Sequence, residues 1–355
     1  MSKLITIVIP TYNMEKYLDR CLTSLIVSSE LMELLEVLVI NDGSKDKSSE
    51  IAHHYAEQYP QTFRVIDKEN GNYGSCINRG LKEATGKYIK ILDADDYFVS
   101  SNWAIFLGRL KQIDADLILT DFCFVDETDT PKKYRRFDIG ANILYKVSDV
   151  IKQISGVEMH AIIYRKQLLL DMNYYQTEGI SYTDAEWATL PIMNISSVFY
   201  VPVHLYNYFV GRDGQTMDPK IFLKRRQEVF SVYNRILEFC TEYHLLQNNL
   251  SVFYQKRLKG YYNSLYAQSL IYREFPSVEL VEIDKNIQKK APKIFEDMSH
   301  STFSKIRYID IWRKNGYKIP LMLTIEIYII CLKRKYFPWL SVGRINSTSI
   351  SQEFC

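Results

Sequence analysis

The sequence predicts an α/β fold in which a mostly parallel sheet is flanked by helices and followed by a helical C-terminal region. Apolar, β-branched runs typical of strands buried on both faces alternate four times with segments of helical spacing within residues 4–92. Parallel strands need crossover connections, and the intervening helices supply them. Beyond residue 218 the strand patterns stop, whereas the helical spacing continues.

Each predicted element follows from its local pattern. The first strand, 4–10, ends at Pro10, which cannot donate a ladder hydrogen bond. Further strands are predicted at 36–40, 63–66, 88–92, 117–124, 159–165, 198–201 and 204–208. Helices are predicted at 15–28, 48–59, 73–84, 102–113, 221–240, 250–272 and 278–287. The resulting domains are 1–217, with halves 1–125 and 126–217, and a helical region at 218–355.

Composition narrows the class of protein. With 355 residues and 47% hydrophobic content the chain can build a substantial core. Its net charge of +2 gives no reason to expect a nucleic-acid partner. The six cysteines lack the paired spacing of zinc or redox motifs, and the N-terminus runs into a strand without a charged and then apolar leader. We therefore expect free thiols and a cytoplasmic protein.

Three carboxylates follow the apolar run 86–92. Because side chains alternate along a strand, Asp93 and Asp95 should leave its end on the same side, where they could share a divalent cation through oxygen ligands. The alternative is a solvated acidic turn. Lys90, inside the apolar run, predicts a buried ion pair, because an unpaired buried ammonium costs several kcal/mol.

Polar segments follow each of the early strands. They are residues 11–13, 42–44, 70–74 and 93–95. Ligands of open parallel sheets bind beyond the carboxyl ends of the strands, so these segments should form one site. The sequence has neither G-x-G-x-x-G after the first strand nor a G-x-x-x-x-G-K-[ST] phosphate loop. A dinucleotide site of the usual kind is therefore not expected.

Three segments together resemble family 2 glycosyltransferases, whose GT-A fold is Rossmann-like. They are Val-Ile-Pro-Thr-Tyr-Asn at 8–13, Asn-Asp-Gly-Ser at 41–44 and Leu-Asp-Ala-Asp-Asp at 92–96. The resemblance covers residues 4–125 firmly and continues more loosely to 217. It implies a nucleoside-diphosphate sugar as donor, a UDP-sugar above others, and Mn²⁺ or Mg²⁺ as cofactor.

The resemblance also implies which residues bind the donor. These residues are Pro10, Thr11, Tyr12, Asp42, Asn72, Asp93 and Ala94. Asp42, one of these residues, would accept a hydrogen bond from the uracil-like ring. A further residue, Asp95, would hold the metal. The sequence departs from many relatives at Ile77, where those relatives carry an arginine. Arg79 and Lys90 are the neighbouring cations that could replace it at the diphosphate.

The second half offers candidates for catalysis. A glycine-led loop brings Asp184 and Glu186 to the start of a helix, where the resemblance places the general base on Asp184. Helix capping is the alternative for Asp184, and Glu186 lies about 200° further round the helix. His160, Glu186 and Arg212 are candidates for acceptor or phosphate contacts. The alternative for His160 is a structural histidine, and the alternative for Arg212 is a surface turn.

The apolar segment 319–332 is too short to span a bilayer, which takes about 20 residues. Basic and aromatic residues follow it at 333–339, a pattern of interfacial membrane anchoring. The alternative is a core helix with a solvated basic end. The sequence thus allows contact with the inner face of the cell membrane.

The expected activity is inverting transfer of a sugar to a hydroxyl of a saccharide acceptor, lipid-linked and serving cell-surface polysaccharide synthesis. Two other classes of protein are alternatives to a glycosyltransferase. A nucleotidyltransferase shares the alternating architecture and acid-bound metal but usually begins with a glycine-rich, basic phosphate loop, which this N-terminus lacks. A catalytically inactive scaffold would keep the sugar-nucleotide pocket and lose the base, and Asp184 argues against it.

Overall fold

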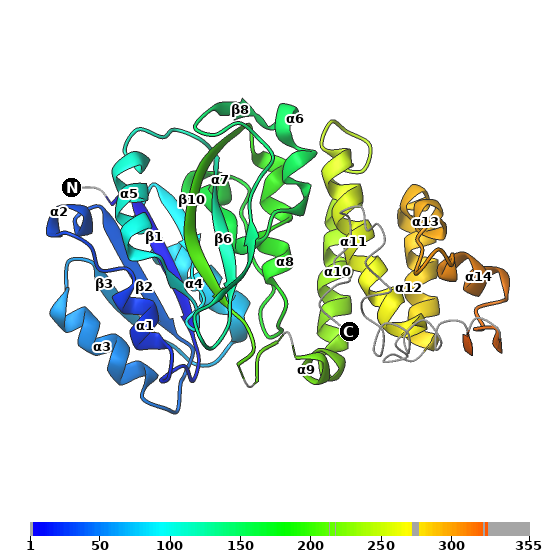
Figure 1. The fold of residues 1–355 in the computed structure, drawn as a ribbon, viewed down its shortest axis with the longest axis horizontal. Helices are drawn as coiled ribbons and strands as arrows, with labels where there is room; N and C mark the ends of the chain where they lie inside the picture. Colours follow the sequence, from blue (N-terminus) through cyan, green and yellow to red (C-terminus); the bar gives the residue numbers. More distant parts are fainter. Residues whose placement is uncertain (1–2, 213, 217, 272–276, 322–323, 326–355) are drawn as a thin grey trace. The chain divides into compact units, whose positions relative to one another are not determined.

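The computed structural model describes residues 3–212, 214–216, 218–271, 277–321 and 324–325 (Figure 1). The chain forms two compact units, Met1–Val232 and Tyr233–Cys355. The predicted domain boundary after residue 217 stays a prediction. Within the described residues, no helix is long and apolar enough to cross a membrane. The predicted membrane-surface segment at 319–332 and its flank at 333–339 fall almost entirely outside these residues.

In the described part of the chain, ten strands form one sheet, in which the main path runs β3-β2-β1-β4-β9-β6-β10-β5. The strands are β1 Ile5–Thr11, β2 Leu35–Asn41, β3 Phe63–Asp67, β4 Tyr88–Ile91, β5 Tyr97–Phe98, β6 Leu117–Val125, β7 Pro131–Arg135, β8 Leu144–Lys146, β9 Ile162–Arg165 and β10 Ser197–Phe209. The first four strands pair in parallel, whereas β9 pairs antiparallel with both β4 and β6. The predicted α/β class is confirmed.

The helices of the first unit cover the sheet: α3 packs on β2 and β3, and α4 packs on β1 and β2. They are α1 Leu18–Thr23, α2 Ser29–Met32, α3 Ser48–Gln58, α4 Asn72–Glu83, α5 Ser100–Leu110, α6 Val147–Val150, α7 Lys166–Asp171, α8 Asp184–Trp187 and α9 Pro219–Lys224. The close approach of α4 depends on Gly80, where an added Cβ would lie 2.4 Å from a methyl carbon of Val8. This contact holds the C-terminal part of α4 against the middle of β1.

Two predicted elements differ in the structure. The helix expected at 15–28 is shorter and forms only α1, because the Ser24 hydroxyl donates to the Cys21 carbonyl (2.6 Å) and accepts the Phe98 backbone N–H (3.0 Å). The next helix, α2, lies beyond the predicted range. The strands expected at 198–201 and 204–208 form the single strand β10, whose register against β6 shifts between Val201 and His204. Local pattern alone did not show either of these tertiary pairings.

The second unit is helical, as predicted for the C-terminal region. Helix α10, Arg226–Glu242, leads into it, and α11 Ser251–Leu270, α12 Ser277–Lys290, α13 Pro292–Ser299 and α14 Tyr308–Lys314 follow. Its interior holds a fully buried carboxylate, Asp284, which accepts hydrogen bonds from the Arg313 Nε at 3.0 and 3.1 Å. Arg313 also donates to the Phe295 carbonyl at 2.7 Å. A buried ion pair with its remaining donors satisfied fixes how α12, α13 and α14 pack together.

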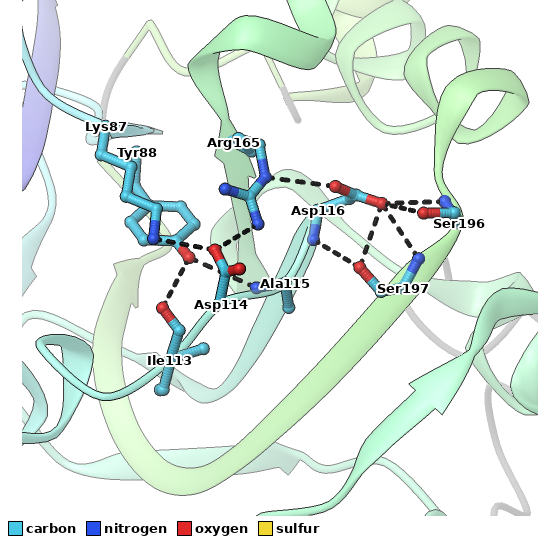
Figure 2. Close-up of polar contacts among 9 residues, drawn as sticks. All are labelled: Lys87, Tyr88, Ile113, Asp114, Ala115, Asp116, Arg165, Ser196 and Ser197. Carbon is cyan, nitrogen blue, oxygen red and sulfur yellow. Dashed lines mark hydrogen bonds and ion pairs between the residues drawn. The ribbon is translucent and has the colours of Figure 1, made fainter.

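A polar network joins four strands of the first unit, at the amino ends of β4, β6 and β10 and the carboxyl end of β9 (Figure 2). Figure 2 shows Asp116 between Arg165 and the Ser196–Ser197 pair. One oxygen of Asp116 accepts from both backbone N–H groups and both hydroxyls of the serines at 2.5–3.1 Å, while the other accepts from Arg165 at 3.2 Å. These hydrogen bonds lower the pKa of Asp116 although its burial acts to raise it.

We predict that Asp116→Asn lowers the free energy of unfolding by at least about 2 kcal/mol, because the amide cannot accept all these donors. Asp114→Asn is the matched control. Its side chain is 75% exposed, so its ion pairs with Lys87 and Arg165 should be worth less than about 1 kcal/mol. Urea denaturation of both variants measures the difference.

The pH dependence provides a second check of Asp116. Because the pKa of Asp116 is lowered in the folded state, its contribution to the free energy of unfolding is complete above the unfolded-state pKa of about 3.9. This contribution is lost as the pH falls through the folded-state pKa. The stabilities of the parent and Asp116→Asn should therefore converge in acid. A constant difference down to low pH would show that the Asp116 charge does not contribute.

Candidate functional site

The carboxyl ends of the parallel strands meet at one edge of the sheet, where backbone hydrogen bonds hold the following loops together. The Asp42 N–H donates to the Thr11 carbonyl at 2.8 Å, and the Lys68 N–H donates to the Asn41 carbonyl at 3.0 Å. Thr11 and Asp42 are buried at this edge, whereas the Tyr12 ring is 45% exposed. The first three predicted donor-binding positions, Pro10, Thr11 and Tyr12, thus line the end of β1.

A lysine that the sequence analysis did not identify lies against Asp42. The Lys68 ammonium donates to Asp42 Oδ1 at 2.5 Å and to Ser75 Oγ at 2.9 Å. Ser75 belongs to α4, which begins at the predicted donor residue Asn72. Asn72 itself has a positive φ of 66°, a backbone conformation that asparagine tolerates well. The ends of β2 and β3 and the start of α4 therefore share one polar contact.

The three carboxylates after β4 point to different partners. Asp93 accepts from the Tyr73 hydroxyl at 2.8 Å. Asp95 forms an ion pair with the Arg212 guanidinium. Asp96 accepts from the Tyr206 hydroxyl at 2.5 Å and from the Phe209 N–H at 2.7 Å. The predicted donor residue Ala94 is buried between them, with 2% exposure.

The crowding of these carboxylates shifts their pKa values. Burial, followed by the charge of Asp95, raises the pKa of Asp93 to about 7. Burial and the charges of Asp95 and Asp93 also raise the pKa of Asp96 well above its usual value. A cation at this position would relieve the repulsion.

The residues present suit a hard divalent cation. Asp93, Asp96 and His160 each offer a ligand atom, and these atoms lie within 4.8 Å of one another. Carboxylate oxygens with an imidazole nitrogen are suitable ligands for Mn²⁺, and oxygens alone suit Mg²⁺. Asp96 is fully buried and already accepts two hydrogen bonds, so it is the least available of the three. Asp95, the ligand predicted from the sequence, lies in the same loop but faces Arg212.

His160 lies beneath these acids. Its ring stacks on Tyr208 with centroids 4.2 Å apart and is only 7% exposed. Burial, and then the nearby charge of Lys90, lowers the pKa of His160 to about 3, so the imidazole is neutral. Its Nδ1 has no hydrogen-bond partner among the described residues. A neutral imidazole of this kind can ligate a metal or accept a hydrogen bond.

The expected ion pair of Lys90 was wrong. Its fully buried ammonium donates to the backbone carbonyls of His160 at 2.7 Å and Ile162 at 3.3 Å. Burial lowers the pKa of Lys90 to about 7. A lysine can therefore be accommodated in this strand because carbonyl oxygens, rather than a carboxylate, satisfy its donors.

Helix α8 presents Asp184 and Glu186 to different surroundings. Asp184 is exposed, and its charge acts on Asp93 and Tyr73, whose pKa values burial and neighbouring acids raise. Glu186 is fully buried and accepts from the Thr177 N–H at 2.9 Å and the Thr177 hydroxyl at 2.7 Å. Asp184 is thus exposed and near enough for its charge to act on Asp93, whereas Glu186 holds the preceding loop.

Arg212 and Arg20 bring positive charge to the same acids. The Arg20 guanidinium donates to the Asp95 carbonyl at 3.3 Å, and both arginines line a cavity of about 600 Å³ beside Lys16 and Tyr17. The charge of Asp95 raises the pKa of Arg212 although burial acts to lower it. Helix α4 contributes no such cation: Ile77 is buried, and Arg79 pairs with Glu83. Sequence reasoning found Arg212 and the segment 70–74 that contains Tyr73, but missed Arg20 and Lys68, for which local pattern gives no signal.

Comparison with known proteins identifies the family of this chain. The profile of Glycosyl transferase family 2 matches residues 6–169. The chain is 31% identical over 223 residues to an uncharacterized glycosyltransferase of Mycoplasma pneumoniae, and the alignment covers 60% of this chain and 70% of that protein. It is 40% identical over 215 residues to the minor teichoic acid biosynthesis protein GgaB of Bacillus subtilis, covering 59% of this chain and 23% of GgaB.

The fold is similar to that of TarS of S. aureus, solved in complex with UDP-GlcNAc. The two share a TM-score of 0.65 and 19% identity, over 88% of this chain and 89% of that chain. This similarity confirms the predicted GT-A fold. The family profile and the Mycoplasma relative show that the chain is a glycosyltransferase and belongs to glycosyltransferase family 2.

Proposed function

We propose that this glycosyltransferase moves a sugar from a UDP-sugar to a hydroxyl group of a saccharide acceptor, with inversion at the anomeric carbon. The observation that carries the proposal is an exposed carboxylate, Asp184, whose charge acts on Asp93 after β4, while its rival Glu186 is buried and accepts from Thr177. In this proposal Asp184 is the base, and the acids after β4 belong to the leaving-group site.

The donor would bind along the ends of β1, β2 and β4. Tyr12 offers an exposed ring against which a base can pack, and Asp42 offers a carboxylate beside it. Asp93, Ala94 and Asn72 complete the surface on the ribose side. The solved complex of TarS with UDP-GlcNAc, a protein of the same fold, supports a nucleotide-sugar donor.

Departure of the diphosphate requires positive charge, which this chain can supply in two ways. A divalent cation would be held by the carboxylates of Asp93 and Asp95 and would act as a Lewis acid on the leaving oxygens. The ligand atoms of Asp93, Asp96 and His160 lie within 4.8 Å of one another, which supports a cation beside Asp93. Arg212, now paired with Asp95, is placed to contact phosphate oxygens as well. Arg20 adds charge to the same wall through its bond to the Asp95 carbonyl.

The acceptor hydroxyl would lose its proton to Asp184. Asp184 starts α8, where backbone N–H groups favour the ionised carboxylate. A base on the side of the sugar opposite the leaving diphosphate leads to direct displacement and thus to inversion. We propose a lipid-linked acceptor at the inner face of the cell membrane, supported by the apolar and basic C-terminal sequence and by the name of the relative GgaB.

We predict that Asp184→Asn leaves the melting temperature and UDP affinity nearly unchanged while sugar transfer falls by at least about a hundredfold, because a positioned base contributes 10²- to 10⁴-fold. Glu186→Gln is the matched control. It should lower the melting temperature, because Glu186 accepts two hydrogen bonds in the core, yet retain most of the transfer rate. The reverse pattern, with Glu186→Gln inactive and Asp184→Asn active, would exchange the two roles.

We predict that Asp95→Ala abolishes Mn²⁺-dependent binding of UDP without unfolding the protein, because Asp95 lies in a loop after β4 rather than in the strand. Calorimetric titration with UDP, with and without Mn²⁺, measures this effect. Asp171→Ala, which removes an exposed acid on α7, is the control and should bind as the parent does. If Asp95→Ala retains full metal-dependent binding, the cation is held by other residues.

Analysis of the reaction products distinguishes sugar transfer from the two alternatives, a nucleotidyltransferase and an inactive scaffold. A nucleotidyltransferase would release pyrophosphate from a nucleoside triphosphate, and an inactive scaffold would bind UDP-sugar without consuming it. Incubation with UDP-sugars and Mn²⁺ should instead release UDP, slowly by hydrolysis and faster with an acceptor. Pyrophosphate release, or binding without turnover under all conditions, would contradict the proposed transfer.

A further inference from the structure

The Lys68–Asp42 contact is a built site in which every donor of the lysine is used. Besides Asp42 Oδ1 at 2.5 Å and Ser75 Oγ at 2.9 Å, the ammonium donates to the Glu69 carbonyl at 2.6 Å. An ammonium has three N–H donors, so Lys68 has none left for a ligand. Its side chain is 17% exposed and that of Asp42 only 4%. Lys68 therefore acts on a ligand through Asp42.

The two oxygens of Asp42 are not equivalent. Oδ1 accepts from the Lys68 ammonium and from the Gly71 N–H at 3.0 Å. Among the described residues, no N–H or O–H donor reaches Oδ2; the Cys76 thiol lies nearby but is a weak donor. Oδ1 thus already accepts two hydrogen bonds, whereas Oδ2 retains the capacity to accept one.

Glycine at position 71 is required for this arrangement. An added Cβ there would lie 2.6 Å from Ser75 Oγ and 3.2 Å from Lys68 Nζ. A second constraint is the Asn70 amide, which donates to the Asp42 carbonyl at 3.0 Å and fixes the loop from the other side. The orientation of the Asp42 carboxylate is therefore determined by the segment 68–75, and not by its own loop.

A carboxylate with a single available oxygen discriminates among nucleobases. Uracil presents one ring N–H between two carbonyl groups, which one oxygen satisfies. Guanine presents two adjacent N–H donors, which need both oxygens of a carboxylate, and cytosine and adenine present no ring N–H on that edge. A donor left unpaired in a buried site costs much of the binding energy, so an incompletely satisfied guanine is disfavoured.

We propose that Lys68 is a positioning residue that makes this site select uracil over guanine, by occupying Asp42 Oδ1 and leaving only Oδ2 for the base. The inference rests on the proposed donor site, in which Asp42 faces the nucleobase. It adds to that proposal a residue that sets the identity of the base and a physical reason for the choice.

The experiment compares UDP and GDP affinities in the presence of Mn²⁺ by calorimetry. In Lys68→Met, Oδ1 becomes available to a second guanine donor, so the preference for UDP over GDP should shrink by about tenfold or more, the usual effect of one hydrogen bond to a charged group. Lys68→Arg, which can still donate to Oδ1, should recover most of the preference. Lys47→Met, an exposed lysine in the loop after β2, is the control and should leave it unchanged.

Ser75→Ala provides a milder variant in case Lys68→Met does not fold. It removes one of the three acceptors of Lys68 and should shift the preference in the same direction by a smaller factor. An equal loss of UDP and GDP affinity in these variants would show a purely structural role and overturn the inference. If the parent binds neither nucleotide, the proposed function fails and the inference with it, whereas UDP binding with an unchanged preference removes the inference alone.

Discussion

Much of this structure depends on the repulsion among three carboxylates at the end of one buried strand. Asp93, Asp95 and Asp96 each need a different compensating group, and these groups come from distant parts of the chain. Asp93 accepts a hydrogen bond from the Tyr73 hydroxyl, and Asp95 forms an ion pair with Arg212. Asp96 accepts from the Tyr206 hydroxyl and the Phe209 N–H. The start of α4, the end of β10 and the following loop are therefore held around β4 by hydrogen bonds and one ion pair to these three side chains.

The strand that carries these acids also joins the two halves of the sheet. Backbone pairing between β4 and β9 stops after Ile89 and Tyr164. One residue further on, the Lys90 side chain takes over by donating to two carbonyls of the adjoining segment, including that of His160. A side-chain ammonium thus replaces ladder hydrogen bonds where the strands separate, and it fixes His160 beneath the acids.

The polar groups at the two ends of the strands differ in how completely their hydrogen bonds are satisfied. At the amino ends, Asp116 satisfies four donors of Ser196 and Ser197 and thereby anchors β10 to β6. At the carboxyl ends, polar groups retain acceptor capacity, as Asp42 Oδ2 and His160 Nδ1 do. Complete satisfaction of polar groups gives stability, whereas incomplete satisfaction leaves groups that can bind a ligand.

The sequence by itself determined the α/β class, the parallel first half, the helical C-terminal region and the family, because these depend on local periodicity and on short motifs at strand ends. Only the tertiary structure decided the partners: carbonyls rather than a carboxylate for Lys90, Thr177 for Glu186, and Lys68 for Asp42. Those contacts join residues 9 to 70 positions apart. No local pattern specifies such pairs, because they form only when the sheet brings the ends of separate strands together.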